Sequence, residues 1–202
     1  MPKASKFQYE IKVFKDKGGL LRTSQALTAG IHPRDLYAMQ AQGLIEPISR
    51  GFFRLKSKKP LWNPDLTTVA LRVPQGVLCL ISALAIHNIT TQIPHEVYIA
   101  LKKGSEKPRL DYPPTRFVWL SPTAFDSGIE THKVGSIVQK VYSPEKTVAD
   151  CFKFRNKIGL DVAIEALKFC RERKRSSVGT LMKYAKIDRV GKVMKPYLEA
   201  IL

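Results

Sequence analysis

The chain has 202 residues, 44% of them hydrophobic, and a formal net charge of +17 at pH 7. This composition is ordinary for a globular protein with one or two small cores, and no apolar run reaches the length that spans a membrane. The strong positive charge indicates a polyanionic partner, and nucleic acid explains it better than a membrane surface because no basic amphipathic anchor dominates the sequence.

The positive charge lies towards the two ends of the chain. Residues 1–59 contain 12 Lys and Arg against 4 Asp and Glu, and residues 150–202 contain 13 against 6, whereas residues 60–149 contain 9 against 7. The basic N-terminus lacks the apolar core of a secretory signal peptide, so we expect a cytoplasmic protein. The cysteines have no zinc-site spacing and are expected to be reduced core residues; they are Cys79, Cys151 and Cys170.

The N-terminal segment contains residues that typically start and end helices, and they predict three short helices. Apolar residues at helical spacing predict the first helix over residues 6–17. Thr23 is the expected cap of the second helix, which Gly30 ends. Pro33 suits the first position of the third helix, because this position needs no N–H, and Gly43 supplies the left-handed stop.

A β-hairpin is predicted after these helices. Residues 44–48 and 52–55 have the composition of short strands, and Arg50-Gly51 supplies the turn between them. Leu20 and Leu21 are expected to form a further short strand that pairs with this hairpin. Helix, turn, helix and hairpin is the order of a winged helix-turn-helix, whose second turn-flanking helix enters the DNA major groove.

The helix that begins at Pro33 is the predicted recognition helix. At about 100° per residue, Leu36 and Met39 lie on its core side, opposite Arg34 and two small residues, Ala38 and Ala41. Arg34 could make a bidentate contact with guanine, Gln42 or Gln40 could contact adenine, and His32 could bind a phosphate or cap its own helix. The alternative is that these are solvated residues of a small helix. The DNA-binding candidates of the two helices are Thr23, Ser24, His32, Arg34, Asp35, Tyr37, Ala38 and Gln42.

Basic residues of the hairpin are predicted to contact phosphates or the minor groove. They are Arg50, Arg54, Lys56, Lys58 and Lys59, and a solvated linker is the alternative for the last three. We expect the DNA-binding domain to comprise residues 1–59, because two prolines bracket the segment 60–64 that follows.

Residues 60–202 are predicted to form a second domain of the α+β class, with a small, mostly antiparallel sheet and C-terminal helices. Period-two patterns predict a strand over residues 97–101 and further strands over 115–120, 128–134 and 136–142. Cap residues and apolar spacing predict helices that begin near Asn63, Ser82, Ser143, Asp161, Ser177 and Val193.

Three stretches resemble the AbiEi-type antitoxins of type IV toxin–antitoxin (abortive-infection) systems. They are the winged unit GGLLRTSQALTAGIHPRDLYAMQAQGLIEPISRGFFRL, the segment SALAIHNI followed by HEVYIALKK, and VYSPEKTVADCFKFRNKIG, which is similar to the family's SPEKTLADC signature. The resemblance implies a transcriptional regulator that binds inverted repeats in its own promoter, and a second domain that counteracts a nucleotidyltransferase toxin without requiring a stable complex. Two alternatives stay open: a module that neutralises its partner by direct contact, and a solo winged-helix regulator.

Two clusters of the second domain have both a structural and a functional interpretation. Ser143, Glu145, Lys146 and Asp150 suit a helix start with a favourably placed acid, and in the family frame they are candidates for the antitoxin function. The run with Arg171, Arg173, Lys174 and Arg175 could form a second basic surface for DNA phosphates or an acidic or RNA-bound partner, or a solvated helix end.

No motif supports an enzyme. Phosphate-binding loop and nucleophile-elbow patterns are absent, and the two E-x-K triplets, at Glu10 and Glu172, fall on predicted helices. The four histidines are not spaced as metal ligands. We therefore expect a non-enzymatic protein without a cofactor or metal site.

Overall fold

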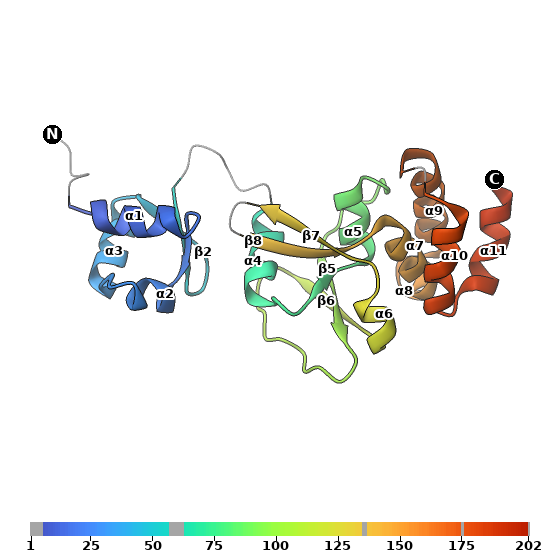
Figure 1. The fold of residues 1–202 in the computed structure, drawn as a ribbon, viewed down its shortest axis with the longest axis horizontal. Helices are drawn as coiled ribbons and strands as arrows, with labels where there is room; N and C mark the ends of the chain where they lie inside the picture. The colour runs from blue at the N-terminus through green and yellow to red at the C-terminus, as the bar shows by residue number, and fades with distance from the viewer. Residues whose placement is uncertain (1–5, 57–62, 135–136, 175, 202) are drawn as a thin grey trace. The chain divides into compact units, whose positions relative to one another are not determined.

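The computed structural model describes residues 6–56, 63–134, 137–174 and 176–201 (Figure 1). The chain divides into two compact units, one of residues 1–68 with 133–138 and the other of residues 69–132 with 139–202. The boundary expected at residue 59 falls within 57–62, outside the described residues, and stays a prediction.

The first unit has the elements of a winged helix-turn-helix. Its three-stranded antiparallel sheet has the order β1–β3–β2, and Leu20 and Leu21 pair with Arg54 and Phe53 across β1 and β3, which confirms the predicted short strand. Its described elements are α1 (Gln8–Asp16), β1 (Leu20–Arg22), α2 (Thr23–Thr28), α3 (Pro33–Ala41), β2 (Ile45–Ser49) and β3 (Phe52–Leu55).

A small apolar core holds this unit together. Its buried members come from the three helices, from β1 and β2, and from two residues outside these elements, Phe7 before α1 and Ile31 in the turn before α3; they are Phe7, Phe14, Leu21, Ala26, Ile31, Leu36, Met39 and Ile45. The predicted core side of the third helix is confirmed, since Leu36 and Met39 are the buried residues of α3. Each buried Leu, Ile, Phe or Met side chain contributes roughly 1.5–3 kcal/mol through the area it removes from water.

The second unit confirms the α+β class, but its sheet is mixed rather than mostly antiparallel. The strand order is β6–β5–β4–β8–β7. β4 pairs with β5 antiparallel, whereas β5 with β6 and β4 with β8 are parallel pairs. The long loop 103–114 brings the chain back to the start of β5 before β6 begins, which is what a parallel neighbour requires.

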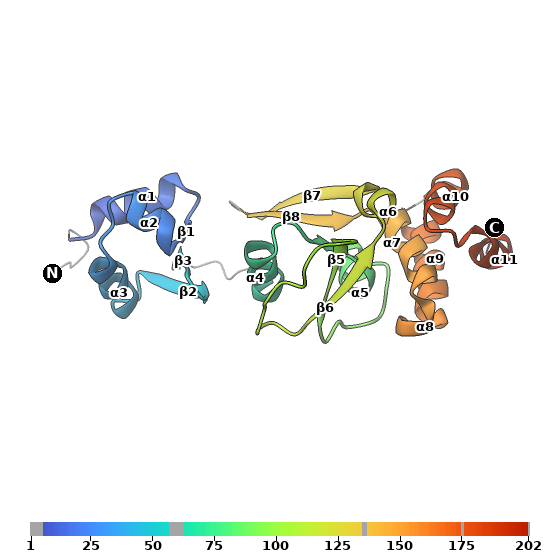
Figure 2. The ribbon, with the colours of Figure 1, turned by 90° about the horizontal axis from the view of Figure 1, so that it is seen from below.

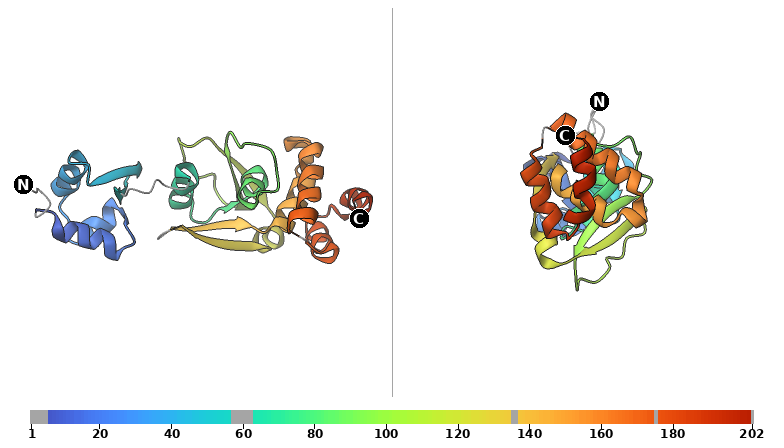
Figure 3. Two further views of the ribbon diagram at one scale, coloured as in Figure 1. Left: turned by 90° about the horizontal axis from the view of Figure 1, so that it is seen from above. Right: turned by 90° about the vertical axis from the view of Figure 1, so that its right-hand side faces the viewer.

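The remaining described elements belong to this half of the chain, and Figures 2 and 3 show its helices against the sheet. They are α4 (Pro64–Arg72), β4 (Val77–Leu78), α5 (Leu80–His87), β5 (Val97–Lys102), β6 (Thr115–Leu120), α6 (Pro122–Asp126), β7 (Ile129–Val134), β8 (Ile137–Tyr142), α7 (Pro144–Lys153), α8 (Arg155–Ile158), α9 (Leu160–Lys174), α10 (Val178–Ile187) and α11 (Gly191–Ala200).

Helix α7 is central to the packing of the second unit. It contacts α5, α8, α9, α10 and α11, which are labelled around it in Figure 1. Val148, Cys151 and Phe152 are fully buried members of the apolar core that this packing forms. All three cysteines are buried, as predicted.

One of the helix caps predicted for residues 60–202 is confirmed and another is wrong. Asn63 caps α4 as expected, because its side-chain oxygen accepts from Leu66 N–H at 3.0 Å. Ser82, however, lies inside α5, and its hydroxyl accepts a hydrogen bond from Tyr98 N–H at 2.9 Å, which joins the helix to β5. In the described part of the chain, no helix combines the length and apolar character needed to cross a membrane.

Candidate nucleic-acid interface

The turn between α2 and α3 is fixed by local hydrogen bonds. Gly30 has φ +83°, the left-handed region that favours glycine, and the hydroxyl of Tyr9 donates to Ala29 O at 2.7 Å. His32 Nδ1 then accepts from Arg34 N–H at 3.2 Å, so the capping alternative for His32 is the one observed. Pro33 occupies the first turn of α3, as predicted.

The free face of α3 presents a cation, an aromatic ring and a small residue. The side chain of Arg34 is 82% exposed, Tyr37 is 66% exposed, and Ala41 is exposed one turn further along. Ala38 is half-buried against the core of the unit, so the free face is centred between Tyr37 and Arg34 and not on Ala38. Gln40 and Gln42 are both exposed.

Arg34 keeps most of its hydrogen-bonding capacity. Its Nε lies 4.0 Å from Asp35 Oδ1, a contact too long to occupy the guanidinium. Asp35 lies in the first turn of α3, where a negative side chain is favoured by the helix dipole. Arg34 can therefore offer its planar pair of donors to a base edge.

Thr23 does not cap α2, contrary to the sequence prediction. It is the first residue of the helix; Arg22 precedes it, and Arg22 N–H donates to Gln25 Oε1 at 2.9 Å. The N–H and hydroxyl of Thr23 both donate to Gly51 O, at 2.9 and 3.3 Å. Thr23 therefore fixes the hairpin turn to α2, whereas Ser24 beside it is exposed.

The wing offers fewer free cations than its sequence suggests. Arg50 and Lys56 are exposed. Arg54 is paired across β2 and β3 with Glu46, and its side chain is only 17% exposed, so this candidate is engaged inside the sheet. Lys58 and Lys59 lie outside the described residues. The free basic residues of the described wing are thus Arg50 and Lys56.

Two further residues of this surface were missed from the sequence. Leu27 on α2 is 43% exposed although leucine usually indicates a core position. Arg22 is exposed on β1, and its guanidinium lies 4.8 Å from the centre of the Phe52 ring.

Two arginines of the predicted second basic surface make contacts within the protein, and the binding role of this surface stays a prediction. Arg171 donates to Ser176 O. Arg173 donates to Asn88 O at 2.8 Å and stacks 3.7 Å from the centre of the Phe169 ring. These contacts give both arginines a structural role; the side chain of Lys174, and Arg175, lie outside the described residues.

Exposed positive charge is instead concentrated on α10 and α11 and the turn between them. The exposed cations there are Lys183, Lys186, Arg189, Lys192 and Lys195. Among the described residues of this segment the acids are Asp188, which is buried, and Glu199, which lies 3.6 Å from Lys195. The surface therefore keeps a net positive charge.

Residues 143–151, with the sequence SPEKTVADC, surround a buried lysine. Lys146 is 0% exposed, and its Nζ lies 2.6 Å from Asp150 Oδ1 and 3.0 Å from Asp188 Oδ2. Lys153 Nζ lies 3.4 Å from the other oxygen of Asp188. Ser143 caps α7 by accepting from Lys146 N–H, as predicted.

The neighbours of this lysine are also fixed by packing. Asp150 is buried, and its Oδ2 has no hydrogen-bond partner among the described residues. Glu145 accepts from the hydroxyl of Ser176 at 2.6 Å, which joins α7 to the end of α9. Every member of the candidate antitoxin cluster thus has a structural role, and its functional role stays a prediction.

Asp150 has the most unusual electrostatic environment of this cluster. Burial raises the pKa of its carboxyl group to about 7, with Lys146 opposing and Asp188 adding to the rise. Burial lowers the pKa of Lys146, but the nearby carboxylates of Asp150 and Asp188 outweigh this effect and raise it. The lysine therefore stays charged, and the carboxyl group is the member of the cluster that can titrate near neutral pH.

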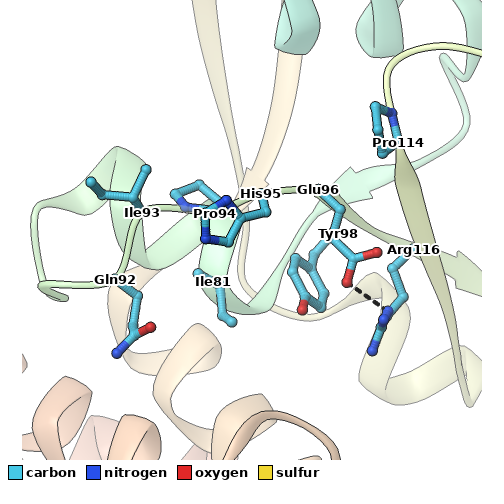
Figure 4. A pocket seen from close by; sticks show the side chains of 9 residues that line it. All are labelled: Ile81, Gln92, Ile93, Pro94, His95, Glu96, Tyr98, Pro114 and Arg116. Carbon is cyan, nitrogen blue, oxygen red and sulfur yellow. Dashed lines mark ion pairs between the residues drawn. The ribbon is translucent and has the colours of Figure 1, made fainter.

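A pocket of about 310 Å³ opens elsewhere on the second unit (Figure 4). Its wall combines Ile81 and Tyr98 with an ion pair in which Arg116 Nε lies 2.7 Å from Glu96 Oε1. Burial, with a hydrogen bond to Glu96, raises the pKa of the Tyr98 hydroxyl. None of the residues predicted from the sequence as functional lines this pocket.

Residues 8–56 match the model of a family described as "Transcriptional regulator, AbiEi antitoxin". Residues 8–56 are therefore similar to the AbiEi family. The match covers the helices and hairpin described above and confirms the resemblance on its first stretch; DNA binding and transcription regulation are the role of this family. No curated protein matches the chain.

The fold of the whole chain resembles a known crystal structure, that of the RV2827C protein from Mycobacterium tuberculosis. The likeness has a TM-score of 0.60, covers 98% of this chain and 82% of the other, and comes with 11% sequence identity. At this identity the likeness concerns the fold alone. It therefore supports the combination of a winged unit and an α+β unit in one chain.

Proposed function

We propose that this protein is a DNA-binding autorepressor and antitoxin of a type IV toxin–antitoxin system. It binds inverted repeats in its own promoter and counteracts a nucleotidyltransferase toxin in the cytoplasm. The observation that carries the DNA-binding half is the free face of α3, where the Arg34 side chain is 82% exposed on a winged unit that matches a regulator family.

The proposed complex follows from this geometry. Helix α3 enters the major groove with Arg34 towards a guanine edge, and Tyr37 beside it contacts a thymine methyl group or a sugar. Arg50 and Lys56 bind phosphates on either side of the wing, and these contacts position the helix without selecting sequence. Two copies occupy the two halves of an inverted repeat.

Binding of the full chain to DNA from upstream of its own coding sequence tests the proposal. We expect a saturable complex on that DNA that survives an excess of scrambled competitor, and repression of a reporter fused to the same promoter. Equal affinity for the scrambled DNA would contradict an operator-specific repressor, because phosphate contacts alone do not distinguish sequences.

Lys56→Gln should weaken binding to every DNA sequence by a similar factor. Lys56 is an exposed cation of the wing, and loss of one phosphate contact reduces the slope of log K against log salt by about one. Fluorescence anisotropy at several salt concentrations measures both quantities. The matched control is Lys12→Gln, which removes one positive charge from an exposed position of α1. If both variants change the slope alike, the wing makes no special contact with DNA.

The double variant Lys183→Gln/Lys186→Gln should weaken binding of operator-length DNA and reduce the salt slope by up to about two. These cations belong to the positive surface of α10 and α11. Lys157→Gln/Lys168→Gln removes the same charge from exposed positions of α8 and α9 and serves as the control. An unchanged slope in the first variant would assign DNA binding to the winged unit alone.

An alternative to the proposed type IV mechanism is that the chain neutralises its toxin by direct contact. The full chain with Arg34→Ala and Lys56→Gln keeps the second unit but should lose operator binding. If this variant still protects cells from a co-expressed nucleotidyltransferase and co-purifies with it, the chain neutralises its partner by contact. Protection without co-purification would support a type IV arrangement, and no protection by either form would favour a solo regulator.

A further inference from the structure

Strand β6 leaves one edge of the five-stranded sheet open. It stands at the end of the strand order, with β5 as its neighbour (Figure 2). The main-chain oxygen of Pro114, the residue before β6, accepts a hydrogen bond from Val97 N–H of β5 at 2.8 Å, and that of Leu120, the last residue of β6, accepts from Lys103 N–H at 2.7 Å. The even-numbered residues of β6 therefore direct their main-chain groups towards β5.

The odd-numbered residues consequently face outward, because successive residues of a strand direct their N–H and C=O groups to opposite sides. These residues are Thr115, Phe117 and Trp119. Within the described parts of the chain, no hydrogen bond reaches their main-chain groups. An unpaired row of donors and acceptors of this kind is a template for another strand.

The two edges of the sheet are protected differently. Strand β7, at the other edge, has the sequence IETHKV, and charged side chains are a common defence of an edge against pairing. Strand β6 has the sequence TRFVWL, with a single charge at Arg116. Trp119 is 40% exposed there. The β6 edge thus lacks the features that keep a sheet edge solvated.

We propose that two copies of this chain associate through their β6 strands, which pair antiparallel about a two-fold axis at Phe117. The sheets of the two copies then form one continuous sheet. The occupant is a second copy because the edge is complementary to itself. With the axis at Phe117, this residue lies opposite Phe117 of the second copy and Thr115 lies opposite Trp119, so every outward N–H meets an outward C=O.

The side chains fit the same register. Arg116, the only charged residue of β6, lies opposite Val118 of the second copy, so no like charges meet. Within its own copy Arg116 is already paired with Glu96 at 2.7 Å. On the other face the two Phe117 rings are cross-strand neighbours, and each Trp119 lies beside a threonine. Aromatic and aromatic–β-branched pairs of this type stabilise antiparallel strands.

Sedimentation of the full chain without DNA tests this pairing independently of the proposed operator. The wild-type chain should show reversible, concentration-dependent dimerisation. Phe117→Lys places two like charges opposite each other at the axis and should lower the association constant about tenfold or more. Thr131→Lys, the same new charge on an exposed position of β7, should leave association unchanged. Thermal unfolding establishes that both variants are folded.

A cross-linking variant keeps the proposal testable if Phe117→Lys does not fold. Opposed residues of a hydrogen-bonded antiparallel pair lie about 5.5 Å apart between Cα atoms, a distance that a disulfide spans. The natural cysteines are all buried, so Phe117→Cys adds the reactive thiol. Under mild oxidation, in which two thiols lose two protons and two electrons to an added oxidant such as oxidised glutathione, it should yield a disulfide-linked dimer, whereas Thr131→Cys should not.

Three results would overturn the proposal. One is a wild-type chain that stays monomeric at hundreds of micromolar. Another is equal cross-linking of the Phe117→Cys and Thr131→Cys variants, which indicates random collisions. The third is dimerisation that Phe117→Lys leaves intact. Single half-site DNA binding by Phe117→Lys should match the wild type, so failure of the pairing and failure of the DNA-binding proposal are distinguishable.

Discussion

Lys146→Met is expected to destabilise the second unit by roughly 3–5 kcal/mol, the cost of leaving a buried charge without its partner. The lysine is 0% exposed and lies between two buried carboxylates, at 2.6 Å from Asp150 and 3.0 Å from Asp188. Methionine fills a similar volume without the charge. Urea unfolding followed by tryptophan fluorescence, to which Trp119 contributes from the same unit, measures the loss.

This loss should depend on pH. Burial raises the pKa of Asp150 to about 7, above an unfolded value of about 3.9, so its contribution to stability is present below pH 4 and declines as pH rises to about 7. Removal of Lys146 raises that pKa further. The penalty of Lys146→Met should therefore be larger at pH 8, where the wild-type carboxyl group is ionised, than at pH 5.5, where it is protonated.

Two comparisons separate a buried ion cluster from an ordinary ion pair. Lys102→Met removes a pair of similar length, 2.7 Å to Asp126, whose side chains are about half exposed, and should cost no more than about 1 kcal/mol. Lys146→Met/Asp150→Leu should recover much of the stability, because Asp188 keeps Lys153 at 3.4 Å. Equal losses for Lys102→Met and Lys146→Met would contradict this account.

Arg34→Ala is expected to weaken operator binding by roughly 1–3 kcal/mol and to relax specificity at a single base pair. The exposed guanidinium near the start of α3 is the strongest donor on the free face, and its nearest acid, at 4.0 Å, does not occupy it. Binding titrations against operators altered one base pair at a time give both quantities. The expected pattern is a loss confined to specific DNA, with non-specific affinity nearly unchanged.

Arg34→Lys is the informative companion variant. It keeps the positive charge but loses the planar pair of donors, so it should retain affinity for random DNA and still lose discrimination at the base pair that Arg34 contacts. If the Arg34→Lys variant retains full specificity, Arg34 contacts phosphates and not a base edge. If Arg34→Ala changes neither affinity nor specificity, α3 is not the recognition helix of the proposed complex.

The winged unit could be predicted from the sequence because its determinants are local. Pro33 and Gly43 mark the ends of α3, and the spacing of Leu36 and Met39 identifies its buried side. The exposure of Arg34 follows from the same helical period. Ala38 shows the limit of this reasoning, because half-burial depends on how closely neighbouring elements approach and not on angle around the helix alone.

The roles of several charged residues were not predictable in this way. Arg54 is held by Glu46 across the hairpin, and Arg173 by Asn88, which lies 85 positions earlier in the chain. Such partners are chosen by tertiary packing, which short-range spacing does not encode. The same holds for the free cations of α10 and α11, which became a candidate surface only once their acidic neighbour Asp188 proved to be buried.

The sequence by itself determined the class of each half and the side of α3 that faces solvent, because helix ends, strand periods and turn residues act over a few positions. Only the tertiary structure decided that Lys146 is a buried counter-ion for Asp150 and for Asp188, 42 positions away, and that β6 is left as an open edge beside β5. Both depend on which distant segments meet when the apolar core closes, and the burial of charge and the pairing of strands are settled at that step.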